Sequence, residues 1–240
     1  MIKIIEFDTI KFNFKKIVDN YFKNFFGQIS ENLHKTTHRN INKSEDYSNL
    51  STPVFELKKN FFDISKDQDL SLIPDFYKID PFFDFNNKNV KGTFIKTYYE
   101  LIKFLQEDFF KKSVIFQSKP TLRIQLPNTI SVGGYHRDSD YGHQKKSLNF
   151  WLPFTNSQNT NTLWIETKKN KKDFRPYNVK WGQILIFDSS LSHGVEVNKE
   201  KYTRASMDFR IILKKDYKKS NKTSPKNNIK FELGGYYTKF

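Results

Sequence analysis

Residues 204–213, RASMDFRIIL, contain the pattern on which the fold of this chain depends. Polar residues, namely Arg204, Ser206, Asp208 and Arg210, alternate with apolar ones along the segment. A period of two predicts a β-strand with one polar and one apolar face. Residues 121–126, TLRIQL, alternate in the same way. Charged side chains on an inward face need a ligand or a partner, so these strands predict a sheet that borders a polar cavity.

Other β-rich runs, separated by turn residues, surround these two segments. They are residues 113–116, 148–154, 162–166 and 184–187. Short strands at this spacing predict a mainly β fold with flanking helices, namely a double-stranded β-helix, or cupin-like jelly roll. A sheet with one solvated face is the alternative for any of these strands taken singly.

Helical periodicity appears on the N-terminal side of this β-rich region. Apolar residues recur at helical spacing over residues 14–26, with Gly27 as the C-cap, and again over residues 97–111. Residues 28–95 are polar and interrupted by prolines, which favours loops and short helices. We therefore expect one domain, residues 1–240, with helical and loop support in 1–112 and the jelly-roll core in 113–213. Residues 214–240 form a C-terminal tail, of which 216–230 is a loop and 231–240 packs against the body.

Composition narrows the classes of chemistry. The 240 residues contain no cysteine, so any protein-bound metal must be held by His, Asp or Glu. No run of 18 apolar residues occurs, and we expect a cytoplasmic protein with no membrane partner. The formal net charge is +15, but the lysines are mostly scattered. A solvated basic surface is favoured over a nucleic-acid footprint, which remains possible.

Three residues have the spacing of a metal site. His136 and Asp138 lie two apart where a loop enters a strand, so an extended backbone directs both to the same side. His193 follows the apolar run 184–187 at a second strand end. Two imidazoles and one carboxylate form the facial triad of non-heme iron(II) oxygenases, which leaves three of six coordination positions open. Asp140 and His143 are competing ligands, but their glycine-containing stretch suits a lid or a substrate contact better.

The motifs follow one another in a characteristic order. His136-Arg137-Asp138 is followed, after the gap 139–192, by His193-Gly194, and Arg204 lies eleven residues beyond His193. With Tyr135, residues 181–187 (WGQILIF), Asn198 and Ala205-Ser206, this series resembles the iron(II)/2-oxoglutarate-dependent oxygenase superfamily, in particular its phytanoyl-CoA hydroxylase-like branch. The resemblance covers residues 121–213.

The resemblance implies Fe(II) as the metal, 2-oxoglutarate and O2 as co-substrates, and His136, Asp138 and His193 as ligands. It implies that Arg204 binds the distal carboxylate of 2-oxoglutarate with help from the Ser206 hydroxyl. A guanidinium suits that role because its rigid fork matches a carboxylate.

Several further residues are candidates for the cavity wall. Asn149 and Arg123 are expected to contact 2-oxoglutarate or the substrate. Arg210 either reaches the substrate or pairs with Asp208, and His143 is expected to contact the substrate.

The resemblance implies a hydroxylase or related oxidase acting on a small molecule, with release of succinate and CO2. Halogenating relatives have a small residue where this chain has Asp138. Two alternatives stay open. One is an alkylated nucleic-acid base demethylase, because such enzymes also place two arginines six residues apart, as Arg204 and Arg210 are here. The other is a non-catalytic cupin-like binding module. The prime substrate and the oligomeric state do not follow from the sequence.

Overall fold

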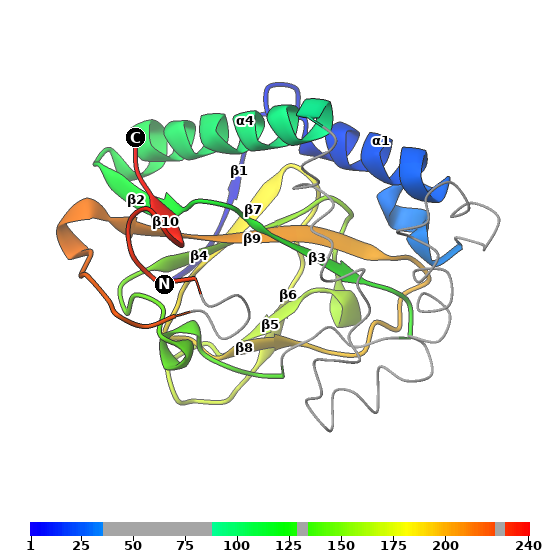
Figure 1. Cartoon of the computed structure of the whole chain (residues 1–240). Helices are drawn as coiled ribbons and strands as arrows, with labels where there is room; N and C mark the ends of the chain where they lie inside the picture. Colours follow the sequence, from blue (N-terminus) through cyan, green and yellow to red (C-terminus); the bar gives the residue numbers. More distant parts are fainter. Residues whose placement is uncertain (36–87, 129–133, 224–228) are drawn as a thin grey trace.

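The computed structural model describes residues 1–35, 88–128, 134–223 and 229–240 (Figure 1). The loops and short helices expected in 36–87 lie outside the described residues, as does 224–228 of the expected C-terminal loop. None of the described helices is long and apolar enough to span a membrane.

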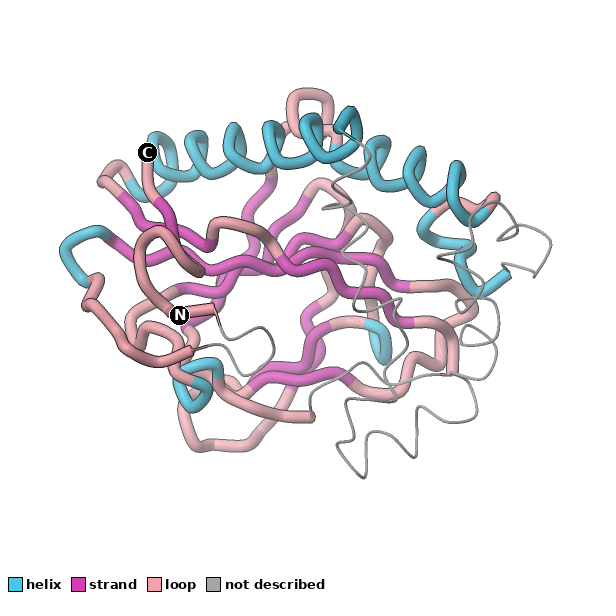
Figure 2. The backbone as a smooth tube through the Cα atoms, viewed as in Figure 1, coloured by secondary structure: helices cyan, strands magenta, loops and turns pink. Residues whose placement is uncertain are grey.

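Two antiparallel sheets form the β part of the described chain (Figure 2). The larger has seven strands in the order β1-β7-β4-β9-β2-β10, with β3 also paired to β9. Its strands are β1 (Ile2–Glu6), β2 (Val114–Gln117), β3 (Thr121–Gln125), β4 (Leu148–Pro153), β7 (Gln183–Asp188), β9 (Arg204–Leu213) and β10 (Tyr237–Thr238). The smaller has the order β6-β5-β8, formed by β5 (Leu163–Ile165), β6 (Arg175–Tyr177) and β8 (His193–Val195). The predicted jelly roll is confirmed.

Two helices cover the outer face of the larger sheet (Figure 1). Helix α1 spans Phe14–Phe26, as its periodicity predicts; the Asn13 side chain caps its start and Gly27, at φ 67°, ends it. Helix α4 (Lys88–Phe104) begins nine residues before the predicted Thr97 and continues into a π-helical segment, η6 (Leu105–Phe110). A 3-10 helix, η1 (Ser30–Lys35), follows α1.

Strand alternation separates the apolar core from the cavity. Phe150 of β4 and Phe209 of β9 stack with ring centroids 5.2 Å apart under the helices, and Tyr98 of α4 packs against Phe209. The opposite face of the larger sheet meets the smaller sheet, where Trp151 and Leu163 belong to a second apolar cluster. The two-faced character predicted for β9 is thus confirmed, because Arg204, Asp208 and Arg210 all line a pocket on this side.

Two strands extend the larger sheet beyond the bounds expected from the sequence. β1 pairs with β7 over all five residues, so residues 1–112 contribute more than helical and loop support. β10 pairs with β2, so the C-terminal tail also enters the sheet, and Phe231 and Tyr237 are fully buried. Both strands are short edge or near-edge elements whose partners lie far away in sequence, and no local pattern specifies such pairing.

Candidate metal centre

The two histidines of the predicted triad are held together by their own backbones. The amide of His136 donates to the carbonyl of His193 at 3.0 Å, and the amide of His193 donates back at 2.9 Å. This single antiparallel bridge sets the imidazole centroids 4.7 Å apart. Gly194 permits the close approach, since a Cβ there would lie 3.1 Å from the Cα of Tyr135.

Asp138 completes a compact group of three possible ligands. It begins a 3-10 helix, η7 (Asp138–Tyr141), and its carboxylate is buried. Asp138 Oδ1 lies 3.4 Å from His136 Nε2 and 3.8 Å from His193 Nε2. One ligand atom from each residue lies within 4.8 Å of the other two. Ligand atoms about 2.0–2.2 Å from one metal ion are roughly 3 Å apart when adjacent, so small shifts would bring this group to a metal.

Hydrogen bonds at the other ring nitrogens prepare both imidazoles for coordination. Nδ1 of His136 lies 2.8 Å from the carbonyl oxygen of Gly134, and Nδ1 of His193 lies 3.1 Å from that of Leu191. A carbonyl can only accept, so each Nδ1 carries the proton and each Nε2 keeps its lone pair for a metal. Burial lowers the pKa of His193 to about 4, which keeps this ring neutral at physiological pH.

The two oxygens of Asp138 face different partners. Oδ1 points to the imidazoles, whereas Oδ2 accepts a hydrogen bond from Arg210 Nε at 2.8 Å and lies 2.7 Å from a terminal guanidinium nitrogen. Burial alone would raise the pKa of the Asp138 carboxyl, but Arg210 and the histidines outweigh it and hold that pKa well below its usual range. The carboxylate therefore stays ionised and offers one oxygen to a metal.

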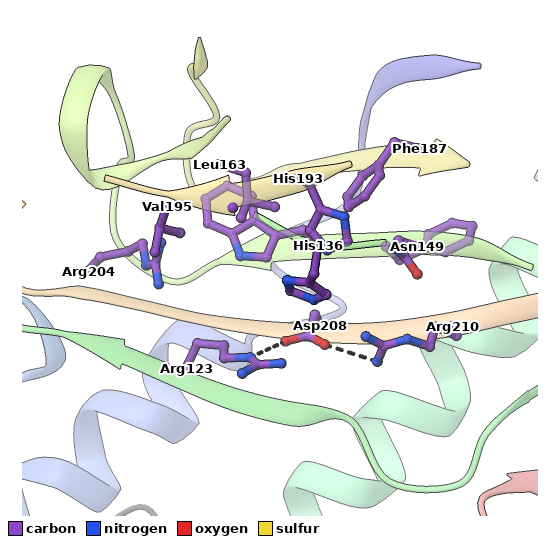
Figure 3. Close-up of a pocket in the computed structure, with 13 residues that line it drawn as sticks. Arg123, His136, Asn149, Leu163, Phe187, His193, Val195, Arg204, Asp208 and Arg210 are labelled. Atoms are coloured by element: carbon purple, nitrogen blue, oxygen red, sulfur yellow. Dashed lines mark hydrogen bonds and ion pairs between the residues drawn. The ribbon is translucent and has the colours of Figure 1, made fainter. Parts of the chain in front are cut away.

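Beyond Asp138, charged residues of β9 and β3 contact one another in series; Figure 3 shows the contacts of Arg210, Asp208 and Arg123. Arg210 also contacts Asp208 at 3.1 Å, and Asp208 accepts a hydrogen bond from Arg123 at 2.7 Å. Gln117 and the Tyr236 hydroxyl lie 3.1 and 3.0 Å from Arg210 Nη1. Of the two roles expected for Arg210, pairing with Asp208 is present, and the contact with Asp138 is an addition that the sequence did not predict.

A pocket that is partly open to solvent lies beside this centre. Thirteen residues line it, namely Arg123, His136, Asn149, Phe150, Trp151, Leu163, Phe187, His193, Gly194, Val195, Arg204, Asp208 and Arg210. Of the predicted metal ligands, His136 and His193 line the pocket and Asp138 does not. Three arginines also line it (Figure 3).

Arg204 and Asn149 are the pocket residues best suited to a carboxylate. The Arg204 side chain is almost completely buried, and its guanidinium carbon lies 5.9 Å from the centre of a Trp151 ring. Both amide atoms of Asn149 are buried without a hydrogen-bond partner among the described residues. A buried amide without partners costs free energy, so Asn149 is poised for a ligand.

Two predicted site residues have other surroundings. Ser206 lies on β9 and accepts a hydrogen bond from the indole of Trp151 at 3.2 Å, and it is absent from the pocket lining formed by the described residues. The ring of His143, expected to contact the substrate, packs between Phe231 and Tyr236 at centroid distances of 4.3 and 5.1 Å. It is absent from the pocket lining formed by the described residues. The competing ligand Asp140 is exposed and outside the three-residue group.

Sequence reasoning did not identify Trp151, Glu166 or Tyr236 as parts of the site. Trp151 could have been recognised, because it alternates in phase with Asn149 on β4. Glu166 contacts Ser192 and Arg137, and Tyr236 contacts Arg210, only through tertiary structure, and nothing in their local sequence marks them.

Comparisons with known proteins give one similar sequence and several similar structures. No protein-family model matches the chain. Streptomycin biosynthesis protein StrG of Streptomyces griseus is 36% identical over 126 residues, which cover 52% of this chain and 60% of that protein. The match thus spans less than two thirds of the relative.

Solved structures with similar folds include non-heme oxygenases. The non-heme monooxygenase ThoJ in complex with nickel has a TM-score of 0.39 at 15% identity, covering 47% of this chain and 49% of that one. The non-heme alpha ketoglutarate dependent epimerase SnoN from nogalamycin biosynthesis has a TM-score of 0.41 at 12% identity, with coverage of 49% and 57%. EctD from S. alaskensis has a TM-score of 0.39 at 13% identity, covering 48% of this chain and 51% of that one. At these scores the fold assignment rests on the strand order of this chain itself.

Proposed function

We propose that this chain is an Fe(II)- and 2-oxoglutarate-dependent dioxygenase of the phytanoyl-CoA hydroxylase-like branch. It would hydroxylate, or otherwise oxidise, a C–H bond of a small-molecule substrate, with release of succinate and CO2. The observation that carries the proposal is the convergence of His136 Nε2, Asp138 Oδ1 and His193 Nε2 at the wall of a pocket.

The donor set fits iron(II). Two neutral imidazoles and one monodentate carboxylate would bind one face of the ion, and bound iron(II) would supply open positions at which 2-oxoglutarate and O2 are activated. His136 and His193 would present Nε2 because their Nδ1 protons are engaged by carbonyls. Asp138 would present Oδ1 because Arg210 holds Oδ2.

The remaining pocket residues would bind and orient the co-substrate and exclude water. Arg204 would pair with the distal carboxylate of 2-oxoglutarate, since it is a buried guanidinium at the pocket wall. Asn149 would donate to or accept from a ligand through its unpartnered amide. Trp151, Leu163 and Val195 supply apolar walls that strengthen the charged contacts by keeping water out.

A small-molecule substrate is supported by the partly open pocket beside the metal centre and by the similarity to StrG, whose name ties it to streptomycin biosynthesis. We extend this to a polar biosynthetic intermediate as the substrate class. Arg123 and Asp208 at the pocket wall would offer one positive and one negative group for hydrogen bonding to such a molecule.

The proposal is tested by O2-dependent turnover. Purified protein with Fe(II), 2-oxoglutarate and ascorbate is incubated with pooled small metabolites, and succinate is quantified against His193→Ala under identical conditions. We expect succinate formation that rises with one pool and is absent in the variant. Wild-type protein that binds iron yet forms no more succinate than His193→Ala in every pool would contradict an oxygenase and favour a binding module.

A further inference from the structure

A buried carboxylate outside the metal ligands contacts both segments that carry them. Glu166 follows β5 directly, and its side chain is completely buried. Its neighbour Ile165 pairs with His193 in the smaller sheet. Glu166 therefore lies beside the point where the His193 strand meets the segment of His136.

One oxygen of Glu166 reaches both ligand segments. Oε1 accepts a hydrogen bond from the amide of Ser192 at 2.7 Å, and Arg137 Nε lies 3.5 Å from the same oxygen. Ser192 precedes His193, and Arg137 lies between His136 and Asp138. A single atom thus links the two parts of the chain that must converge on a metal.

Backbone bonds fix Glu166 itself. Its amide donates to the carbonyl of Ser192 at 3.0 Å, and its Oε2 accepts from the amide of Lys172 at 3.2 Å. Burial tends to raise the pKa of the Glu166 carboxyl, but the amides of Ser192, Lys172 and Asn170, together with Arg137, lower it below its ordinary value. The ionised Glu166 carboxylate interacts with donors from three segments of the chain. Its side chain is not exposed to solvent, so a role at the protein surface does not account for it.

We infer that Glu166 is a positioning residue for the metal centre, which holds the His136–Asp138 segment and the Ser192–His193 segment at coordination distance. This inference rests on the metal centre of the proposed function. Groups outside the ligand set that orient the ligands typically change metal affinity by about 10–100-fold when they are replaced.

Glu166→Gln is the informative substitution, because it preserves size and one acceptor oxygen. Its NH2 group must face one of the N–H donors, so the contacts to Ser192, Arg137 and Lys172 cannot all persist. The matched control is Asp173→Asn, because Asp173 stabilises the same turn, residues 166–173. Its carboxylate accepts hydrogen bonds from the Thr167 amide at 3.0 Å and from the Thr167 hydroxyl at 2.7 Å. Among the hydrogen bonds of the described residues, none joins Asp173 to either ligand segment.

The experiment titrates Co(II), as a spectroscopic substitute for iron, into the metal-free proteins under anaerobic conditions. Affinity and the visible d–d spectrum are recorded, with circular dichroism and Tm as measures of folding. We expect the Kd of Glu166→Gln to rise about 10–100-fold and its d–d spectrum to change. Asp173→Asn should retain the wild-type Kd and spectrum even if its Tm falls.

Each outcome decides the inference. A folded Glu166→Gln protein with wild-type affinity overturns it, as does an equal loss of affinity in Asp173→Asn. If Glu166→Gln does not fold, Arg137→Met decides, because it leaves the backbone bonds of Glu166 intact: weaker Co(II) binding supports the inference and unchanged binding overturns it. Wild-type protein that binds no Co(II) or Fe(II) would refute the metal centre itself, which is a separate result.

Discussion

Arg210 and Asp138 form a buried ion pair in which two guanidinium nitrogens, at 2.7 and 2.8 Å, converge on the same carboxylate oxygen. This arrangement leaves the other oxygen of Asp138 directed at His136 and His193. Arg210 thereby orients a metal ligand, and it also connects that ligand through Asp208 to Arg123.

Arg210→Ala is expected to weaken metal binding as well as any contact with substrate. The substitution leaves the buried Asp138 without its guanidinium partner, whereas Asp208 keeps Arg123. Breaking a buried pair costs about 3–5 kcal/mol of stability. The Kd for Fe(II), measured anaerobically by calorimetry, should rise about 10–100-fold. Lysine keeps the charge but cannot direct two nitrogens at the carboxylate, so the Fe(II) Kd of Arg210→Lys should lie between those of Arg210→Ala and wild type. Wild-type Fe(II) affinity in a folded Arg210→Ala protein would refute this role.

Arg204→Ala should raise the 2-oxoglutarate requirement while Fe(II) remains bound. A charge-assisted hydrogen bond contributes about 1.5–3 kcal/mol, which corresponds to roughly ten- to a hundredfold in affinity. The measurement is the KM for 2-oxoglutarate at saturating iron, with Arg123→Ala as the comparison. Arg123 is engaged by Asp208, so its replacement should affect the co-substrate less. Equal KM values in Arg204→Ala and wild type would remove Arg204 from the co-substrate site.

Asn149→Leu is expected to stabilise the ligand-free protein and to impair binding. Both amide atoms of Asn149 are buried without a partner among the described residues, and this costs about 1–3 kcal/mol that an apolar side chain of similar size avoids. Thermal unfolding without ligands should therefore give a higher Tm for the variant, whereas the Kd for 2-oxoglutarate or for substrate should rise. A lower Tm together with unchanged binding would show that Asn149 has a structural role only.

The metal-free protein should lose stability as the pH falls below about 6.5. Burial lowers the pKa of His143 to about 3 and that of His193 to about 4, so the unfolded chain takes up these protons before the folded one does. The stability contributed by the neutral rings is complete above the unfolded pKa and decreases as the pH falls toward the folded values.

His143→Phe isolates one of these contributions. A phenyl ring keeps the packing with Phe231 and Tyr236 but takes up no proton. Between pH 6.5 and 4, denaturant unfolding of the metal-free variant should show a loss of stability about 2–3 kcal/mol smaller than in wild type. Parallel pH profiles for the two proteins would contradict a neutral buried ring at this position. A loss of turnover in this variant would instead restore the expected substrate contact.

The sequence predicts the elements that have local signals. The period-two alternation of residues 204–213 gave β9 with its bounds, and the periodicity of residues 14–26 with Gly27 gave helix α1. The spacing of His136, Asp138 and His193 predicted three residues whose possible ligand atoms the fold brings within 4.8 Å of one another. For β9 and α1, the periodicity of the backbone fixes which side chains share a face. The triad forms differently from the expectation, because Asp138 begins a 3-10 helix and does not lie on a strand with His136.

Other features depend on partners that no local pattern specifies. The ring of His143 lies against Phe231 and Tyr236, which are far away in sequence, and it is absent from the pocket lining formed by the described residues. Glu166 acquires its partners only when β5 pairs with β8. The second contact of Arg210, with Asp138, spans 72 residues of sequence.

Fe(II) stoichiometry distinguishes the chosen carboxylate from its neighbour. Asp138→Ala should lose bound iron, because it removes one of three protein ligands, whereas Asp140→Asn should retain one equivalent, since Asp140 is exposed and outside the ligand group. Metal analysis after anaerobic loading and gel filtration gives the result. Retention of a full equivalent by Asp138→Ala, with loss in Asp140→Asn, would reassign the third ligand.

An anaerobic titration of 2-oxoglutarate into the Fe(II)-loaded wild-type protein examines the metal centre and the co-substrate together. Chelation of a 2-oxo acid to iron(II) produces a visible charge-transfer band. We predict that the band saturates at one 2-oxoglutarate per iron, requires a higher concentration in Arg204→Ala, and is absent in His193→Ala. A wild-type protein that holds one iron(II) but develops no band at saturating 2-oxoglutarate would contradict the assignment of this chain as a 2-oxoglutarate-dependent oxygenase.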